Sequence, residues 1–146
     1  MIIAPLLAAL AAAQPAPPPT VGKIRMQLFY EDSGRLSADI SPPSDFSGWN
    51  TVIGEGSAEE PANDLLVTVE LVTGAVESVA EPLTVTVRGN RKVLGQRRFA
   101  DVLTSADGRT WKALWLTDVG CAGHVEVTAT IGRSTRKAAV SLDCGE

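Results

Sequence analysis

The residue types that perform acid–base and nucleophilic chemistry are sparse in this sequence. His124 is the single histidine, so a catalytic triad that uses an imidazole base could use only that residue. Ser33, Ser57 and Ser105 fall in predicted turns, and no spacing links any of them to His124. The Gly-x-Ser-x-Gly, phosphate-loop and dinucleotide-binding patterns are also missing from the sequence. The sequence therefore predicts that the chain is not an enzyme.

Cys121, His124 and Cys144 have the residue types of a two-cysteine, one-histidine metal site. Their spacing argues against that site, because residues three apart on a strand, such as Cys121 and His124, point to opposite faces. A disulfide would also consume both thiolates. We therefore predict a Cys121–Cys144 disulfide, with no metal and no cofactor.

A second candidate site, Asp45 to Glu60, lies within the longest irregular stretch of the chain, Ser44 to Asn63. Its acidic residues could supply oxygen ligands to calcium, but their spacing matches no calcium motif, so a solvated acidic loop is favoured. The stretch also contains Phe46-Ser47-Gly48-Trp49-Asn50, and binding residues tend to lie on loops held by a rigid scaffold. The possible binding residues are Trp49, Asn50, Glu55, Glu59 and Glu60.

Two interpretations of the tryptophans remain open. Trp111 and Trp115 share one face of a predicted strand and could form a sugar-stacking platform, although packing in the core is favoured. Trp49, with Phe46, is expected to be at least partly buried over one end of the domain. The three glutamates of the stretch should then lie outward as an acidic rim.

The elements that position these residues are predicted to be strands. From Val21 onward, apolar and polar residues alternate with period two. The predicted strands cover residues 23–30, 35–40, 65–72, 83–88, 92–103, 110–116, 124–131 and 135–142. Short strands separated by frequent turn signals are typical of an all-β protein. We predict an immunoglobulin-like antiparallel β-sandwich of seven or eight strands, with a small β-barrel as the alternative.

Three hairpins follow from the turn residues. Asp32-Ser33-Gly34 should join the first two strands and place Tyr30 opposite Leu36. Ala106-Asp107-Gly108 should place Leu103 opposite Trp111. Gly132-Arg133 should join the last two strands, so that Val125 faces Val140 and Cys121 falls opposite Cys144.

The N-terminal segment differs from the rest of the chain. Residues 2–13 read IIAPLLAALAAA, carry no charge and end in three alanines, the small residues that a signal peptidase accepts. We predict a signal peptide over 1–13, a proline-rich linker over 14–20 and the β-sandwich domain over 21–146. No Lys or Arg precedes the apolar run, which a wrongly chosen start codon would explain. A buried N-terminal helix is the alternative. The predicted location is extracytoplasmic, either periplasmic or secreted.

Composition argues against some classes of partner but does not identify the function. The net charge of −4 argues against nucleic acid as the partner, and no membrane span is expected in the mature chain. We expect a non-catalytic exported binding or envelope-associated domain, whose partner would be a protein or glycan of the cell envelope. One alternative is a carbohydrate-binding module that uses Trp49 with Trp111 or Trp115. A second alternative is a small exported enzyme.

Overall fold

The computed structural model describes residues 11–12, 17–75 and 78–145. Most of the predicted signal peptide (1–10 and 13) and residues 14–16 of the predicted linker therefore lie outside the described residues. No helix among the described residues is long and apolar enough to cross a membrane.

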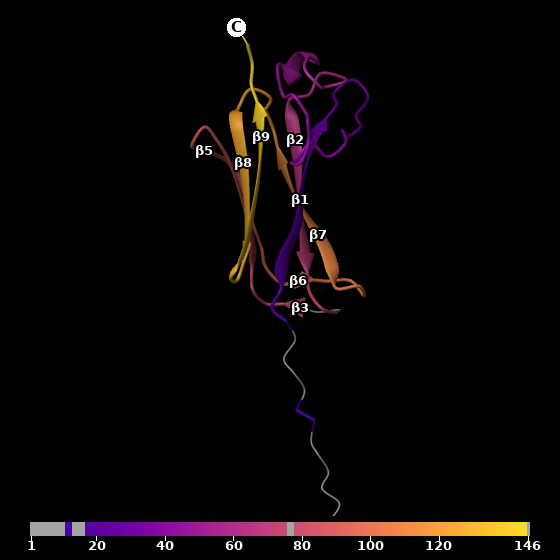
Figure 1. Ribbon diagram of the computed structural model, residues 1–146, viewed down its shortest axis with the longest axis vertical. Helices are drawn as coiled ribbons and strands as arrows, with labels where there is room; N and C mark the ends of the chain where they lie inside the picture. The colour runs from indigo at the N-terminus through magenta and orange to yellow at the C-terminus, as the bar shows by residue number, and fades with distance from the viewer. Residues whose placement is uncertain (1–10, 13–16, 76–77, 146) are drawn as a thin grey trace, which may run out of the picture.

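The domain consists of two antiparallel sheets that pack face to face (Figure 1). The first sheet has the order β1 (Thr20–Phe29), β2 (Asp64–Val72) and β7 (Arg109–Leu116). The second has the order β5 (Lys92–Phe99), β4 (Leu83–Gly89), β8 (Gly123–Ile131) and β9 (Ser134–Leu142). Two short strands, β3 (Ser78–Val79) and β6 (Val102–Leu103), pair with each other, and η1 (Thr51–Ile53) is a single helical turn. The predicted antiparallel β-sandwich is confirmed, and the barrel alternative is wrong because the sheets do not close.

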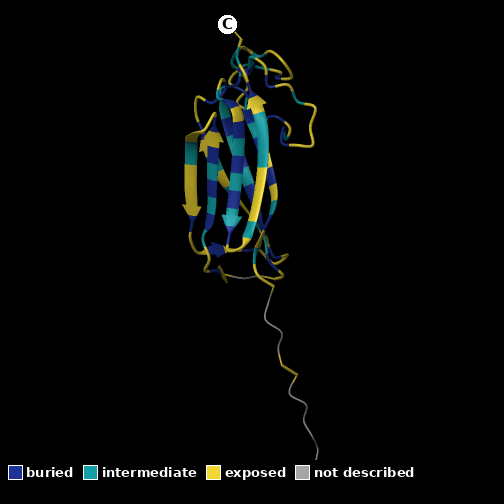
Figure 2. Ribbon diagram, turned by 60° about the vertical axis from the view of Figure 1, so that its left-hand side comes forward, coloured by how far each residue is buried: buried dark blue, intermediate teal, exposed yellow. Residues whose placement is uncertain are grey.

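The core lies between the sheets and is built from every second residue of the central strands. Successive side chains of a strand point to opposite faces, so an alternating sequence buries one face only. Figure 2 shows this alternation as dark blue and lighter bands along the strands. The inward residues are Ile24, Met26 and Leu28 of β1, Leu65, Val67, Val69 and Leu71 of β2, Leu83, Val85 and Val87 of β4, and Val125, Val127, Ala129 and Ile131 of β8.

The predicted C-terminal hairpin is confirmed in its register. β8 and β9 pair so that Val125 is opposite Val140 and Val127 is opposite Ala138. Gly132 has a φ of 53° in the intervening turn, a conformation that glycine adopts without the steric cost of a Cβ atom.

The predicted first hairpin is wrong by one residue. Leu36 bridges Phe29 rather than Tyr30, so Leu36 is exposed while Tyr30 is buried. The segment that follows makes no regular ladder with β1, because the Asp39 carboxylate replaces a backbone carbonyl and accepts the Met26 N–H at 3.0 Å. Burial opposes ionisation of Asp39, but hydrogen bonds from Ser41 and Met26 outweigh it and hold the pKa of Asp39 below its ordinary value.

The predicted hairpin between residues 92–103 and 110–116 is also wrong. Asp101 has a φ of 53°, which interrupts the predicted strand and divides it into β5 and β6. β5 stays beside β4 in the second sheet, whereas β7 crosses to the first sheet and pairs with β2. Trp111 is therefore opposite Glu70 of β2 rather than Leu103. This crossing moves both tryptophans of β7 from the expected core to the outer face of the first sheet.

Candidate functional site

The stretch from Asp45 to Glu60 packs over the end of the sandwich where the C-terminus lies (Figure 1). Trp49 forms a parallel bridge with Asp143, just beyond β9. The Asn50 N–H donates to the Asp143 carbonyl at 2.8 Å, and the Asp143 N–H donates to the Gly48 carbonyl at 3.0 Å. The stretch is thus held to the second sheet by backbone hydrogen bonds.

Two glycines allow this close approach. A Cβ atom on Gly48 would lie 2.0 Å from the backbone oxygen of Ser141, so a larger residue would not fit there. A Cβ atom on Gly145 would lie 2.5 Å from the indole of Trp49, which places part of the indole against the C-terminal backbone. Trp49 nevertheless remains 49% exposed and Phe46 is half-buried. Trp49 is therefore a partly covered anchor for the stretch rather than a free platform.

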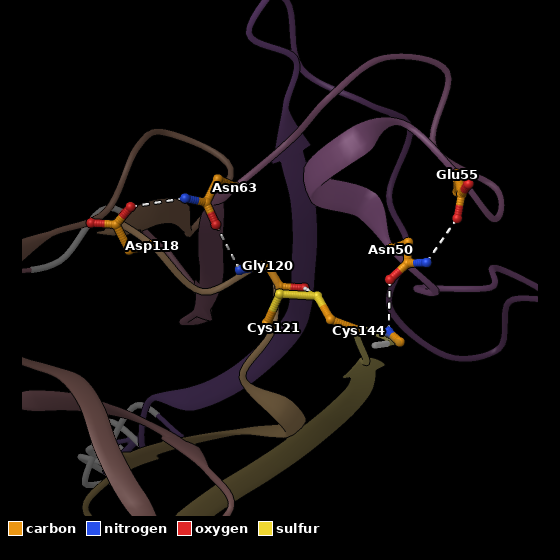
Figure 3. The surroundings of a disulfide bond; sticks show 8 residues. Asn50, Glu55, Asn63, Asp118, Gly120, Cys121 and Cys144 are labelled. Atoms are coloured by element: carbon orange, nitrogen blue, oxygen red, sulfur yellow. Dashed lines mark hydrogen bonds between the residues drawn. A yellow bond between two sulfur atoms is a disulfide. The ribbon is translucent and has the colours of Figure 1, made fainter.

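Both polar atoms of the Asn50 side chain form hydrogen bonds that hold this stretch in place. Its Nδ2 donates to Glu55 at 2.7 Å, and its Oδ1 accepts the Gly145 N–H at 2.8 Å (Figure 3). Asn50 has a φ of 48°, in the left-handed region that asparagine tolerates better than most residues. Asn50 and Glu55 thus stabilise the conformation of the loop.

The expected acidic rim is wrong for Glu60 and is partly neutralised by Arg35. Arg35 binds both Glu59 and Glu60, the latter at 3.4 Å, and Glu60 also accepts the Ser33 N–H at 3.0 Å. The side chain of Glu60 is only 18% exposed, whereas Glu55 and Glu59 do lie outward. The hydrogen bond to Glu59 raises the pKa of Arg35 above its ordinary value. These carboxylates hold the turn after β1 and are not arranged as free ligands.

The predicted disulfide is present beside this stretch. Cys121 and Cys144 are bonded with their Cα atoms 5.1 Å apart. The adjoining loop is held by Asn63, whose Oδ1 accepts the Gly120 N–H at 3.2 Å and whose Nδ2 donates to Asp118 at 2.8 Å (Figure 3). Among the described residues, no group of three ligating side chains gathers as a metal site would require.

A different surface, the outer face of the first sheet, gathers the other two tryptophans. Trp111 is 37% exposed and Trp115 is 44% exposed. The Arg25 guanidinium lies 4.1 Å from the centre of the Trp111 ring. The Trp115 ring meets the edge of Phe29, and its Nε1 donates to Asp64 at 3.1 Å. Neighbouring strands therefore hold both indoles in fixed positions.

We call Arg25, Phe29, Leu66, Trp111 and Trp115 the tryptophan face. Leu66 is opposite Trp115 in the β2–β7 ladder, so it lies between Trp115 and β1 on the outer face of the first sheet. The two indoles are four residues apart on one strand, which corresponds to roughly 13–14 Å along the strand. The expectation that these tryptophans pack in the core is wrong, although their shared strand face was evident from the sequence. The signal that would have identified the face is the pairing of β7 with β2, which local patterns do not reveal.

No protein-family model matches the chain, and no curated protein matches it either. Its function is therefore inferred from its own residues.

Proposed function

We propose that this chain is a non-catalytic exported binding domain and that the tryptophan face binds a glycan of the cell envelope. The observation that carries the proposal is the pair of half-exposed indoles, Trp111 and Trp115, on one outer face of a sheet. Monomeric soluble proteins rarely leave a contiguous apolar patch in water unless it binds something.

The chemistry of the tryptophan face suits a sugar. The apolar C–H face of a pyranose ring stacks on an indole, while its hydroxyl groups need polar partners at the rim. Arg25 supplies donors beside Trp111, and Asp64 supplies acceptors beside Trp115. Two indoles separated by several strand residues favour an extended oligosaccharide over a single sugar.

Two described carboxyl groups, those of Asp107 and Asp39, have pKa values that do not suit a general acid. A general acid at neutral pH needs a carboxyl group whose pKa is raised. Hydrogen bonds, chiefly from the Ser105 side chain, lower the pKa of Asp107. The pKa of Asp39 is also below its ordinary value, for the reason given above. Both shifts run opposite to the requirement for an acid catalyst.

Replacing either tryptophan of this face should weaken glycan binding while leaving the fold intact. We expect Trp115→Ala and Trp111→Ala each to weaken glycan binding at least about tenfold, because the loss of a central aromatic anchor costs about 2 kcal/mol or more. Ligands found on a glycan array with the wild type would be measured by titration calorimetry against each variant.

Trp49→Ala is the matched control, because Trp49 is also a half-exposed tryptophan but contacts Gly145 at the end of the sandwich. We expect it to lower the melting temperature and to leave glycan binding unchanged. Glycan binding that survives both β7 substitutions, or that is lost with Trp49→Ala, would contradict the proposal. A wild type that binds no glycan but captures an envelope protein through Trp111 and Trp115 would replace the glycan with a protein ligand.

Export is tested separately from binding. We propose that the mature chain begins at Gln14, after the uncharged segment that ends in Ala13. A disulfide is compatible with an oxidising compartment. The intact mass of the protein from its native host should equal that of residues 14–146. Recovery of the uncut chain in the cytoplasmic fraction would refute export.

A further inference from the structure

Charge is distributed unevenly over this acidic protein. The hairpin of β4 and β5, Leu83–Phe99, contains five basic residues and no Asp or Glu. We call this segment the basic hairpin; its cations are Arg88, Arg91, Lys92, Arg97 and Arg98. The whole chain has 13 basic and 17 acidic residues, so the remainder has 13 − 5 = 8 basic residues and a net charge of 8 − 17 = −9. The hairpin thus has a charge of +5 within a strongly acidic molecule.

The five cations are exposed, and the salt bridges among the described residues include none of them. Over the described residues, none of them lies within 4.0 Å of a carboxylate oxygen. Arg97 instead donates to the Ala113 carbonyl at 3.3 Å and covers the Phe99 ring. The acid opposite Arg88 in the ladder is Glu126, which forms its ion pair with Lys137 at 3.4 Å. The positive potential of the hairpin is therefore free to attract an external anion.

The tip of the basic hairpin also carries an exposed apolar residue, Val93. Asn90 and Arg91 have φ values of 45° and 71°, as in the tight turns that close two-residue hairpins. Val93 follows the turn, lies opposite Arg88 in the ladder and is 47% exposed. Figure 1 shows β5 at the margin of the molecule, with its turn projecting outward. An exposed apolar side chain beside basic residues can enter the boundary between lipid headgroups and acyl chains while the basic residues bind the headgroups.

We propose that the basic hairpin docks the protein on an anionic phospholipid surface. The headgroup phosphates would be bound by Arg88, Arg91, Lys92 and Arg98, and Val93 would enter the interface. The contrast between +5 on the basic hairpin and a net charge of −9 on the rest of the chain would favour approaches that bring the hairpin toward the lipid. The site belongs to the second sheet, so it is independent of the tryptophan face.

Co-sedimentation with vesicles tests this docking. We expect the protein to bind vesicles that contain phosphatidylglycerol and to dissociate from them at high salt. We expect no binding to vesicles of pure phosphatidylcholine. The double variant Arg91→Gln/Arg98→Gln should bind about 20- to 30-fold more weakly, since each basic residue near an anionic surface contributes about fivefold. Val93→Ser should weaken vesicle binding and leave binding to a soluble polyanion such as duplex DNA unchanged.

The matched control is Arg133→Gln/Arg136→Gln, which removes two exposed arginines from the β8–β9 hairpin and changes the net charge equally. All variants keep the same N-terminal segment, so any affinity of that segment for lipid cancels in the comparison. We expect the control pair to retain most vesicle binding. Equal losses in the two pairs would overturn the proposal, and so would duplex DNA that competes fully with vesicles at equal phosphate concentration.

Discussion

Leu83→Ala is expected to lower the free energy of unfolding by about 2–5 kcal/mol, the range for removing a buried leucine from a packed core. Leu83 is fully buried in β4, where it pairs with Phe99 of β5 and Ile131 of β8. The substitution leaves a cavity in the core at the start of β4, because its neighbours on both sides are held by backbone ladders. Urea or thermal denaturation of the purified variant measures the loss.

Leu103→Ala is the matched control for that measurement. It removes the same atoms, but Leu103 is 63% exposed in the short strand β6. We expect a change within about 0.5 kcal/mol, as for other surface substitutions. A large loss of stability for Leu103→Ala would indicate that Leu103 packs against Trp111, as in the hairpin predicted from the sequence. It would contradict the strand crossing that creates the tryptophan face.

Removing the disulfide is the second change with a large expected effect. Cys121→Ala/Cys144→Ala should lower the free energy of unfolding by about 3 kcal/mol, because the bond closes a loop with a sequence separation of 23 and restricts the unfolded chain. For a domain of this size, that corresponds to a fall in melting temperature of about 10 °C. Differential scanning calorimetry of the double variant checks both the size and the reversibility of the loss.

Reduction of the wild type provides a control without mutation. We expect dithiothreitol to destabilise the wild type by a similar amount and to leave the double variant unaffected. Thiol titration of the denatured, unreduced wild type should find no free thiol. Two titratable thiols would contradict the Cys121–Cys144 disulfide. Stoichiometric zinc in the purified protein would support the metal site instead.

The parts of the fold that were predicted correctly depend on short-range information. Val125 and Val140 were placed opposite each other because Gly132-Arg133 leaves only two residues between their strands, and the disulfide followed from the same register. The inward faces of β2 and β4 were also correct, since alternation along one strand is a local property of the chain. In these elements, turn chemistry and hydrophobic pattern point to the same structure.

The errors occur where two local solutions compete. Leu36 shifted by one position because the turn spans residues 31–34, with the Tyr30 N–H donating to the Arg35 carbonyl at 2.9 Å. The strand expected over residues 92–103 broke at Asp101, whose left-handed conformation is uncommon for a residue with a Cβ atom. Neither feature has a signal in the periodicity of the sequence.

The sequence alone therefore determined the all-β class, the alternation that forms the core, and the cysteine pair. The tertiary structure decided which strands share a sheet, and with it the identity of the candidate binding surface. β7 pairs with β2, from which it is separated in the sequence by β3, β4, β5 and β6, so Trp111 and Trp115 join Arg25 and Phe29 on an open face. The physical reason is that strand pairing depends on contacts across the whole chain, while the pattern within a strand reports only that one of its faces is buried.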